Sequence, residues 1–245
     1  MNTRQQDILN QLEQHGEITV KSLAEQFSVS AMTIHRDLDF LEEQHCIYKK
    51  RGAAVFVEQP DRLRGSFYAD EKGRIGQKAA EFVRPGQSIL FDNSTTALEV
   101  AKHLAGIPSL TFYTTNLEIA AIVASYPNTV LYCSGGYYFP DSKGFTGPQA
   151  EDFVSRIQAD LCIIGASGIS ITHGITNPYP MHTALQRKII EASAQRILVA
   201  DHSKFGKVAM EKAADLTELH HIITDSGLVE ETAAQYRHYV PLTLV

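Results

Sequence analysis

Three features are missing from this sequence, and each absence excludes a class of protein. Its 245 residues include only three cysteines, at positions 46, 133 and 162, which lie far apart and lack the spacing of metal ligands. We therefore expect reduced core thiols, no metal site and no cofactor. No apolar run approaches the ~18 residues of a membrane span, and the N-terminus is polar rather than signal-like. We expect a cytoplasmic protein without a membrane partner.

An excess of basic residues, the usual sign of nucleic-acid binding, is also missing. The formal net charge is −6, and the segment 1–57 is slightly acidic as well. This balance argues against a protein that coats nucleic acid. Any DNA binding must then come from a few well-placed cations and from two copies acting together. With 44% hydrophobic residues, the chain is otherwise an ordinary globular one, long enough for a small and a medium domain.

Residues 20–43 have the pattern of two short helices joined by a tight turn. In each half, apolar residues recur at the spacing of one helical face: Val20, Leu23, Ala24 and Phe27, then Ile34, Leu38 and Leu41. Ser30 lies where its hydroxyl can cap the second helix. This is the pattern of a helix-turn-helix, whose second helix lies in the DNA major groove. An ordinary helical hairpin with a solvated polar face is the alternative.

The outward face of the second helix carries the candidate DNA contacts. Thr33, His35, Arg36 and Asp37 are expected on or near the outward side of its first two turns, which are the turns that meet base edges. Arg forms bidentate bonds to guanine, and Thr and His can reach a base edge or a phosphate. The predicted DNA-binding residues of this segment are Ser30, Thr33, His35 and Arg36.

Residues 46–57 have the pattern of two short strands around a Gly turn. Three consecutive cations, Lys49, Lys50 and Arg51, stand at the tip of this hairpin. A hairpin behind a helix-turn-helix is a wing, and its cations would contact the phosphate backbone beside the groove. A solvated charged face is the alternative for the cation run alone. Residues 1–57 are thus expected to form a winged helix-turn-helix domain.

Residues 58–72 lose the apolar periodicity and are predicted to be a linker. From 73 to 245 the chain alternates short apolar strands with helices. We expect strands at 88–91, 110–113, 129–133, 161–164, 197–200, 221–224 and 239–245. We expect helices at about 75–83, 97–104, 117–125, 151–157 and 184–194. Such short buried strands imply a mostly parallel α/β sheet covered on both faces.

Polar or glycine-rich turns follow the predicted strands. In an open α/β sheet the carboxyl ends of the strands line one crevice, where ligands bind. Ser94, Thr95 and Thr96 stand where a strand gives way to a helix, so their hydroxyls and free N–H groups would cradle an anion such as a phosphate. Lys204 can supply a cation, and glycines allow close approach of the backbone. Simple loop chemistry is the alternative for each turn taken alone.

The segment 3–57 resembles the winged helix-turn-helix of the DeoR family of bacterial transcription regulators. The family's opening Arg-x-x-x-Ile-Leu is matched by Arg4, Ile8 and Leu9. Its recognition helix, Thr-Ile-Arg-Arg-Asp-Leu, stands here as 33–38 with His35 in place of Arg. Its wing, roughly Arg-x-His-Gly-Gly-Ala, is replaced by Lys-Lys-Arg-Gly-Ala-Ala at 49–54. The resemblance implies DNA binding, and the departures bear on the operator sequence.

The segment 73–225 resembles the sensor domain of the same family. Four motifs of the family are present. They are Asp-x-Gly-Thr-Thr at 92–96, with Ser94 in place of Gly, Thr-Asn at 115–116, Gly-Gly at 135–136 and Asp-x-Ser-Lys-Phe-Gly at 201–206. The resemblance implies a sugar-phosphate effector and a fold similar to ribose-5-phosphate isomerase. The predicted effector-binding residues are Asp92, Ser94, Thr95, Thr96, Thr115, Asn116, Gly135, Gly136, Gly165, Ser167, Gly168, Arg187 and Lys204.

Two departures from the sensor pattern remove carboxylates. The family's Gly-x-Asp-Gly becomes 165–168, with Ser167 for Asp. Its Glu-Ala-x-x-Lys-Arg is matched to 183–188, with Thr183 for Glu and with Arg187, a candidate phosphate ligand, for Lys. Acid–base work on a sugar needs a positioned carboxylate, so we expect no catalytic residues and no enzyme activity. His182 is expected to be a loop or surface residue.

These patterns predict a DNA-binding regulator. We expect a repressor of a sugar-metabolism operon that binds double-stranded operator DNA and responds to a phosphorylated sugar. A two-fold homo-oligomer, dimer or tetramer, is expected because palindromic operators mirror protein symmetry. The alternative is a sugar-phosphate isomerase-like enzyme with an accessory N-terminal domain.

Overall fold

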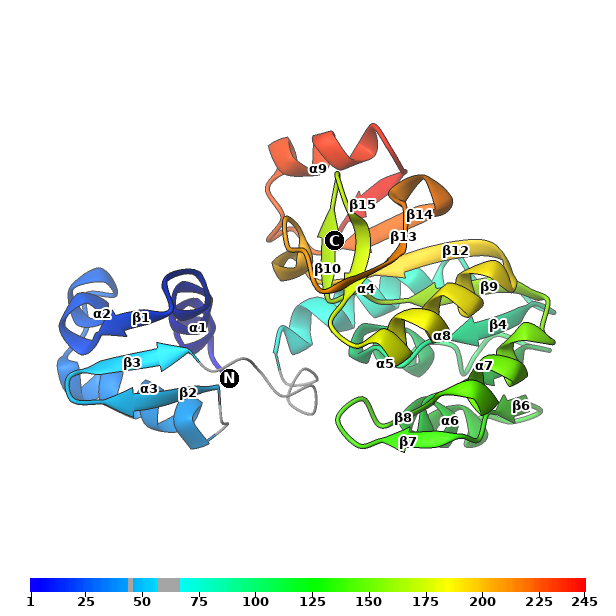
Figure 1. Cartoon of the computed structure of the whole chain (residues 1–245), viewed down its shortest axis with the longest axis horizontal. Coiled ribbons are helices and arrows are strands. Elements are labelled where there is room, and N and C mark those ends of the chain that lie inside the picture. Colours follow the sequence, from blue (N-terminus) through cyan, green and yellow to red (C-terminus); the bar gives the residue numbers. More distant parts are fainter. Residues whose placement is uncertain (44–45, 57–66) are drawn as a thin grey trace. The chain divides into compact units, whose positions relative to one another are not determined.

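The computed structural model describes residues 1–43, 46–56 and 67–245 (Figure 1). The chain divides into two compact units, Met1–Tyr68 and Ala69–Val245, called here the first and the second unit. The predicted linker 58–72 overlaps both. Its residues 58–66 lie outside the described residues, and residues 69–72 form the first turn of a helix in the second unit.

The first unit consists of three helices and a small antiparallel sheet. The helices are α1 (Thr3–His15), α2 (Val20–Gln26) and α3 (Ala31–Glu43). The strands are β1 (Glu17–Thr19), β2 (Ile47–Lys50) and β3 (Ala53–Phe56), in the order β1-β3-β2. The helix-turn-helix and the hairpin are confirmed. Strand β1 was not predicted because three residues give no periodic signal.

The core of the first unit is made by the apolar stripes of its helices. The fully or almost fully buried side chains include Ile8, Leu9, Leu12, Leu23, Ile34, Leu38 and Leu41. Helix α1 ends at Gly16, whose φ of 76° is a conformation that glycine adopts without strain. The stripes predicted from the 3.6-residue period are therefore the faces that pack.

The second unit is built on a seven-stranded parallel sheet in the order β15-β14-β12-β9-β4-β5-β6. Its strands are β4 (Ser88–Phe91), β5 (Thr111–Thr114), β6 (Val130–Cys133), β9 (Ala159–Ile164), β12 (Ser193–Val199), β14 (His221–Thr224) and β15 (Leu242–Leu244). Each of the seven overlaps a segment predicted as a strand, but β12 begins at Ser193, inside the helix predicted at 184–194, and β9 begins two residues before the predicted segment. Because the strands are parallel, their carboxyl ends lie along one edge of the sheet, called here the carboxyl edge.

Two small antiparallel sheets complete the strands of the second unit. One pairs β7 (Tyr137–Phe139) with β8 (Gly144–Thr146). The other has the order β10-β11-β13 and contains β10 (Gly168–Ser170), β11 (Gly174–Asn177) and β13 (Glu211–Ala214). None of these was predicted, since strands of three or four residues show no alternating pattern long enough to read.

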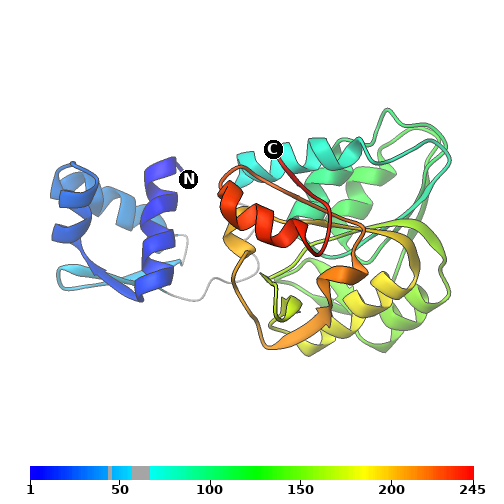
Figure 2. The ribbon, with the colours of Figure 1, turned by 90° about the horizontal axis from the view of Figure 1, so that it is seen from above.

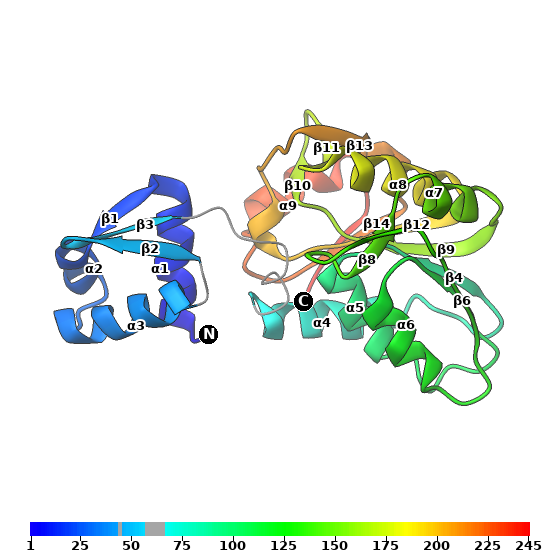
Figure 3. The same cartoon turned by 60° about the horizontal axis from the view of Figure 1, so that its bottom comes forward.

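Helices cover both faces of the parallel sheet, as predicted. Helices α4 (Ala69–Ala80), α5 (Thr95–Lys102) and α6 (Leu117–Ala124) pack on one face. Helices α7 (Pro148–Ser155), α8 (Pro180–Glu191) and α9 (Glu230–Arg237) contribute to the core on the other face. Figures 2 and 3 show α4 and α5 separated from α8 by the sheet. Among the described helices, none is both long and apolar enough to cross a membrane.

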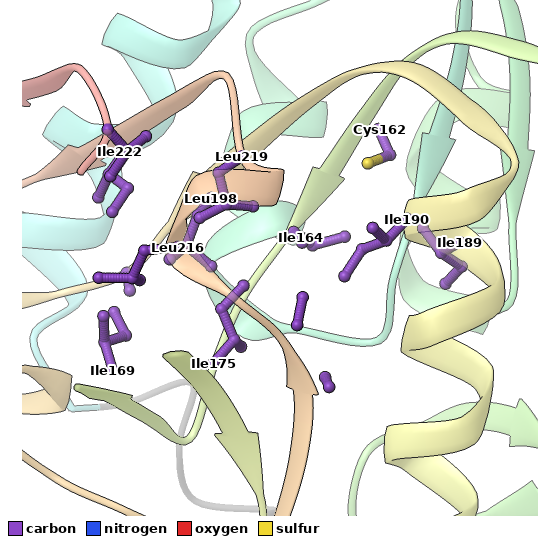
Figure 4. Packing of buried hydrophobic residues seen from close by; sticks show 14 of the residues in the cluster. Cys162, Ile164, Ile169, Ile175, Ile189, Ile190, Leu198, Leu216, Leu219 and Ile222 are labelled. Carbon is purple, nitrogen blue, oxygen red and sulfur yellow. The ribbon is translucent and has the colours of Figure 1, made fainter. Parts of the chain in front are cut away.

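Strand β9 shows how one strand serves both cores. Its Leu161 and Ile163 pack with α4, α5 and α6, while Cys162 and Ile164 pack on the side of α8 (Figure 4). This is the two-residue alternation of a strand buried on both faces. Burial raises the pKa of the Cys162 thiol to about 12, so this thiol stays protonated. Cys133, predicted as a core thiol, is exposed on the edge strand β6.

Candidate functional site

Helix α3 presents a polar surface at its amino end. His35 and Arg36 are exposed, Thr33 is half-buried, and Ile34 between them is fully buried. The structure thus brings three of the predicted DNA contacts to one exposed surface of the first two turns, which are the turns that meet base edges in helix-turn-helix proteins. Met32 is 70% exposed on the same turn and was not predicted as part of this surface.

Ser30 caps α3. Its Oγ accepts a hydrogen bond of 3.2 Å from the Thr33 N–H, and the two hydroxyls are hydrogen-bonded at 3.0 Å. The cap satisfies one of the backbone donors that a helix leaves unpaired at its start. Ser30 therefore sets the position at which Thr33 stands. A direct contact of Ser30 with DNA stays a prediction.

Asp37 does not lie on the outward face, so that expectation was wrong. It is only 3% exposed, because it follows Ile34 by three residues and falls on the buried stripe. Its carboxylate accepts hydrogen bonds from Arg4 Nε at 2.6 Å and Gln5 Nε2 at 3.1 Å. The hydrogen bond to Asp37 raises the pKa of Arg4. Asp37 thus fastens α3 to α1.

The wing cations differ in their surroundings. Lys49 Nζ pairs with Asp39 and with Glu42, the latter at 3.0 Å, and Lys50 pairs with Glu17. Within the described part of the first unit, Arg51 makes no ion pair; it stands exposed in the turn between β2 and β3. The three cations lie at the tip of the hairpin as predicted, with only Arg51 unneutralised.

In the second unit, Asp92 ties the turn after β4 to its neighbours. Its Oδ1 accepts a hydrogen bond of 2.9 Å from the Ser94 N–H, and its Oδ2 accepts one of 2.8 Å from the Gly165 N–H and one of 3.0 Å from Gln186 Nε2. Burial raises the pKa of Asp92. All three donors are neutral. With both oxygens engaged, this carboxylate is a structural centre and not a free base.

The turn after β4 leads directly into the amino end of α5. Ser94 Oγ accepts from the Ala97 N–H at 3.1 Å and caps the helix. Thr95 and Thr96 form its first turn, so their N–H groups have no partner in the helix itself. These are the elements of an anion site: positive helix end, backbone donors and hydroxyls.

The loop after β9 lies against this turn. A Cβ on Gly165 would stand 2.4 Å from Ser94 Cβ, so only glycine allows this approach. A Cβ on Gly168 would stand 2.6 Å from the Lys207 carbonyl oxygen. Ser167 is held by a 3.3 Å hydrogen bond from its N–H to Asn177 Oδ1. The two glycines thus serve close packing of the loop, and contact with a ligand stays a prediction for both.

The turn after β5 joins the same group of loops. Thr115 Oγ1 donates to Asn93 Oδ1 at 2.6 Å. Asn116 caps α6 by accepting from two N–H groups, and its Nδ2 donates to the Ser142 carbonyl oxygen at 3.1 Å. The β7–β8 hairpin is therefore fastened over this turn. Gly144 of β8 lies so close to Asn93 that a Cβ would stand 2.3 Å from it.

Gly135 and Gly136 follow the edge strand β6, farther from Asp92. The φ of Gly136 is 134°, and a Cβ there would stand 2.9 Å from the Thr146 carbonyl oxygen. Gly136 thereby allows the chain that enters β7 to pass close to the end of β8. Both glycines lie in the segment that leads from β6 into the β7–β8 hairpin. Among the described residues, neither contacts Asp92 directly.

The turn after β12 holds the predicted cation. Asp201 is 1% exposed, and its Oδ1 accepts from the Ser203 N–H at 3.1 Å. Among the described residues its Oδ2 has no hydrogen-bond partner. Burial by itself would raise the pKa of Asp201, but the charges of Lys204 and Lys72 hold it below its usual value. Lys204 thus lies near a buried carboxylate at the carboxyl edge.

A second pair fixes this turn to the end of β14. His202 Nδ1 lies 2.7 Å from Asp225 Oδ2, and the His202 N–H donates to Asp225 Oδ1 at 2.8 Å. The hydrogen bond with Asp225 raises the pKa of His202. Neither residue was among the predicted site residues, because no local pattern pairs positions separated by a helix and two strands.

Arg187 does not join these loops, and its assignment as a phosphate ligand is corrected. Its guanidinium donates to Glu191 at 2.9 Å, to Glu218 at 2.6 Å and to the Ala213 carbonyl oxygen at 3.4 Å. The preceding residue, Gln186, faces Asp92 and Gly165 instead. One residue of helix turns a side chain by about 100°, so the adjacent residues Gln186 and Arg187 face different surroundings.

His182 lies one helical turn before Gln186 and is not a simple surface residue. Its Nε2 lies 3.4 Å from Ser142 Oγ, and its ring contacts those of Phe139 and Tyr179 at centroid distances of 5.0 and 5.4 Å. Residues at i and i+4 share a helix face. Helix α8 thus presents His182 and Gln186 on the side of the carboxyl-edge loops.

All five predicted turns follow adjacent strands of the parallel sheet, and hydrogen bonds or close contacts join the turns after β9, β4 and β5. The loops after β12, β9, β4 and β5 stand in that order along the carboxyl edge. Strands lie ~4.8 Å apart, so the carboxyl ends of β4 and β12, two positions apart in the sheet, are about 10 Å apart. Among the described residues, no group of three or more His, Cys, Asp and Glu side chains could hold a metal ion.

Comparisons with known proteins identify both units. Residues 4–60 match the model of the DeoR-like helix-turn-helix domain, and residues 68–226 match that of the DeoR C terminal sensor domain. The chain is 34% identical to the transcriptional repressor AccR of Agrobacterium fabrum, over 91% of this chain and 89% of that protein. It is 33% identical to the glycerol-3-phosphate regulon repressor of Escherichia coli, over 91% and 90%.

Similarity to solved structures is more distant. The chain aligns with ribose 5-phosphate isomerase A from Methanocaldococcus jannaschii at 15% identity and a TM-score of 0.42, over 56% of this chain and 55% of that one. The relatives identified by sequence are regulators and not enzymes. Both the prediction of a regulator and the exclusion of an isomerase are thereby confirmed. The chain belongs to the DeoR family of helix-turn-helix transcriptional regulators.

Proposed function

We propose that this regulator is a repressor whose second unit binds a phosphorylated sugar or polyol at the carboxyl edge. The main support is that the amino end of α5, which contains Ser94, Thr95 and Thr96, lies against the loop of Gly165. A helix amino end with hydroxyl groups favours a phosphate. Lys204, in the loop after β12 on the same edge, supplies a cation for a second part of the ligand.

The groups around the α5 amino end favour a ligand with one anionic end and hydroxyl groups. Half-buried Asn93, next to the α5 cap Ser94, offers an amide that suits a sugar hydroxyl, and Thr115 and Asn116, buried and bonded within the protein, hold this part of the site in place. One relative is named after the glycerol-3-phosphate regulon. A phosphorylated polyol or sugar is therefore the ligand class to test first.

In the first unit, the exposed amino end of α3 is the part proposed to read the operator. Thr33, His35 and Arg36 would meet base edges, and Arg51 would contact a phosphate. Because this unit lacks a basic excess, we propose that two copies bind a two-fold operator together. Ligand binding then shifts the operator affinity only if the ligand prefers one of two states of the protein.

The ligand proposal is tested by calorimetric titration of the full-length protein with glycerol 3-phosphate, pentose 5-phosphates and hexose 6-phosphates. The unphosphorylated compounds and inorganic phosphate serve as references. The expected result is binding of at least one phosphorylated compound and no binding of its unphosphorylated counterpart. Binding of the unphosphorylated compounds alone would contradict the phosphate site.

A variant locates the site. Thr95→Ala removes one hydroxyl from the first turn of α5 and should weaken the binding of the phosphorylated compound about tenfold, the loss of one hydrogen bond to a charged group. Thr217→Ala, at an exposed threonine elsewhere in the second unit, is the matched control. Equal affinity in the two variants would remove the α5 amino end from the site.

A further inference from the structure

Gln186 occupies a central position among the carboxyl-edge loops. It is 6% exposed, and its Nε2 donates one hydrogen bond to Asp92 Oδ2 at 3.0 Å and another to the Gly165 carbonyl oxygen at 2.8 Å. The Gly165 N–H also donates to Asp92 Oδ2, at 2.8 Å. The three groups thus form a closed triangle that joins α8 to the turns after β4 and β9.

Asn177 extends the triangle to β11. Its Nδ2 donates to Gln186 Oε1 at 2.7 Å, and its Oδ1 accepts from the Ser167 N–H at 3.3 Å. Every hydrogen-bonding atom of the Gln186 amide therefore has a partner within the protein. A buried amide so fully paired has one orientation, which in turn fixes the groups that it bonds.

The loop that Gln186 fixes is the one that faces the α5 amino end. Gly165 lies in van der Waals contact range of Ser94, the cap of α5, and the Ser94 N–H donates to the same Asp92 carboxylate. A change in the Asp92–Gln186 bond therefore displaces the 165–168 loop and the start of α5 together. Both are parts of the proposed phosphate site.

The charge of this triangle depends on a single carboxyl group. Asp92 is its one ionisable group, and the donors to Asp92 are two backbone N–H groups and the neutral amide of Gln186. Leucine at position 186 would fill similar space but would leave a buried carboxylate short of a donor, and such losses are costly. Glutamate would keep the shape and could donate only in its protonated form.

We propose that Gln186 is a positioning residue of the ligand site, acting through Asp92 and Gly165 on the amino end of α5. This inference rests on the proposed ligand site. It adds that a residue of α8, which need not touch the ligand, holds the loops of that site in position. Its partner Asn177 holds the Gln186 amide in the required orientation.

The first test needs no ligand. Amide hydrogen exchange is measured on the full-length protein for the segment 165–168 and the residues around Ser94, in wild type, Gln186→Leu and the control Gln158→Leu, at an exposed glutamine before β9. Exchange should accelerate at least tenfold in both segments of Gln186→Leu alone. Unchanged exchange there, in a variant that keeps the wild-type melting temperature, would overturn the proposal.

The second test uses inorganic phosphate as the probe, titrated by calorimetry. Gln186→Leu should weaken phosphate binding about tenfold. Gln186→Glu, whose protonated carboxyl group can replace one of the two donated bonds, should bind phosphate more tightly than Gln186→Leu near pH 5.5 and lose that advantage near pH 8.5. Operator affinity without ligand should stay unchanged in all variants. Equal phosphate affinity in wild type and Gln186→Leu would overturn the proposal. If wild type itself bound no phosphate, the proposed ligand site would fail, and hydrogen exchange alone would decide the role of Gln186.

Discussion

Arg4 Nε donates a 2.6 Å hydrogen bond to Asp37 Oδ2, across 33 positions of the sequence. Arg4 belongs to α1 and Asp37 to α3, so the bond joins the first helix to the helix proposed to read DNA. Gln5 adds a second hydrogen bond to the same carboxylate. The orientation of the exposed surface of α3 thus depends on a residue that is itself buried.

Removal of this link should destabilise the first unit and weaken operator binding. Asp37→Ala leaves two donors without their acceptor, and the melting temperature of the first unit should fall by about 5 °C, as expected for a hydrogen-bonded group in a domain of this size. The measurement is thermal unfolding followed by circular dichroism. Asp39→Ala, at an exposed carboxylate of the same helix, is the control. Equal melting temperatures in the two variants would show that the link is unimportant.

The wing cations should contribute unequally to DNA binding. Arg51 has no ion pair among the described residues, whereas Lys49 is paired with Asp39 and Glu42. If Arg51 contacts a phosphate, Arg51→Ala should lower the slope of log affinity against log salt by ~0.9. Lys49→Ala should change it less, because this cation is already neutralised. Fluorescence anisotropy across a salt series measures both slopes, and the reverse order would contradict the assignment.

Gly165 should accept no side chain. A Cβ there would stand 2.4 Å from Ser94 Cβ, so Gly165→Ala must displace either the 165–168 loop or the cap of α5. We expect a loss of about 1–3 kcal/mol in the free energy of unfolding of the second unit and at least tenfold weaker ligand binding. Gly106→Ala, where a Cβ would meet nothing within 4 Å, is the control. Wild-type behaviour of Gly165→Ala in urea unfolding and calorimetry would rule out the tight packing.

The His202–Asp225 pair should make stability depend on pH. The hydrogen bond with Asp225 raises the pKa of His202, so its contribution to stability is fully present below the ordinary His value of about 6.5 and is lost as pH rises through the folded-state pKa. Burial opposes ionisation of Asp225, yet the bonds from His202 lower its pKa overall. The Asp225 contribution is therefore lost only in acid, as pH falls through its folded-state pKa.

The corresponding measurement is the melting temperature of wild type and His202→Asn from pH 6 to 9. Wild type should be more stable by a few degrees at pH 6, and the difference should shrink as pH rises. A constant difference over this range would mean that His202 is not protonated in the folded protein at pH 6.

Local patterns were sufficient for the strands and helices that have a buried stripe. Ile34, Leu38 and Leu41 repeat at helical spacing and are all fully buried. The same rule failed for α9, whose segment Glu230–Arg237 buries only Ala233 and Tyr236 and shows too few apolar residues to be recognised. Burial in these cases is decided by tertiary packing and not by the segment alone.

The candidate site was predictable only in part, because its contacts connect distant positions. The turn of Ser94 and Thr95 stood out by composition, and strand order placed it at the carboxyl edge. Asp37 was placed outward despite its spacing from Ile34, because carboxylates are seldom buried without a partner and its partner Arg4 lies 33 positions away in the sequence. Gln186 was passed over in favour of Arg187, since the choice between adjacent helix positions depends on the face that packs, which only the fold defines.

The most direct test of the account is the operator affinity of the full-length protein with and without ligand. Anisotropy titrations on the DNA upstream of its own gene would use wild type and Arg36→Ala, each with and without the phosphorylated compound that binds best. The account predicts a loss of about 1–3 kcal/mol for Arg36→Ala and an affinity change of about 5-fold or more on adding the ligand to wild type. Absence of operator binding, or an affinity that no phosphorylated compound alters, would contradict it.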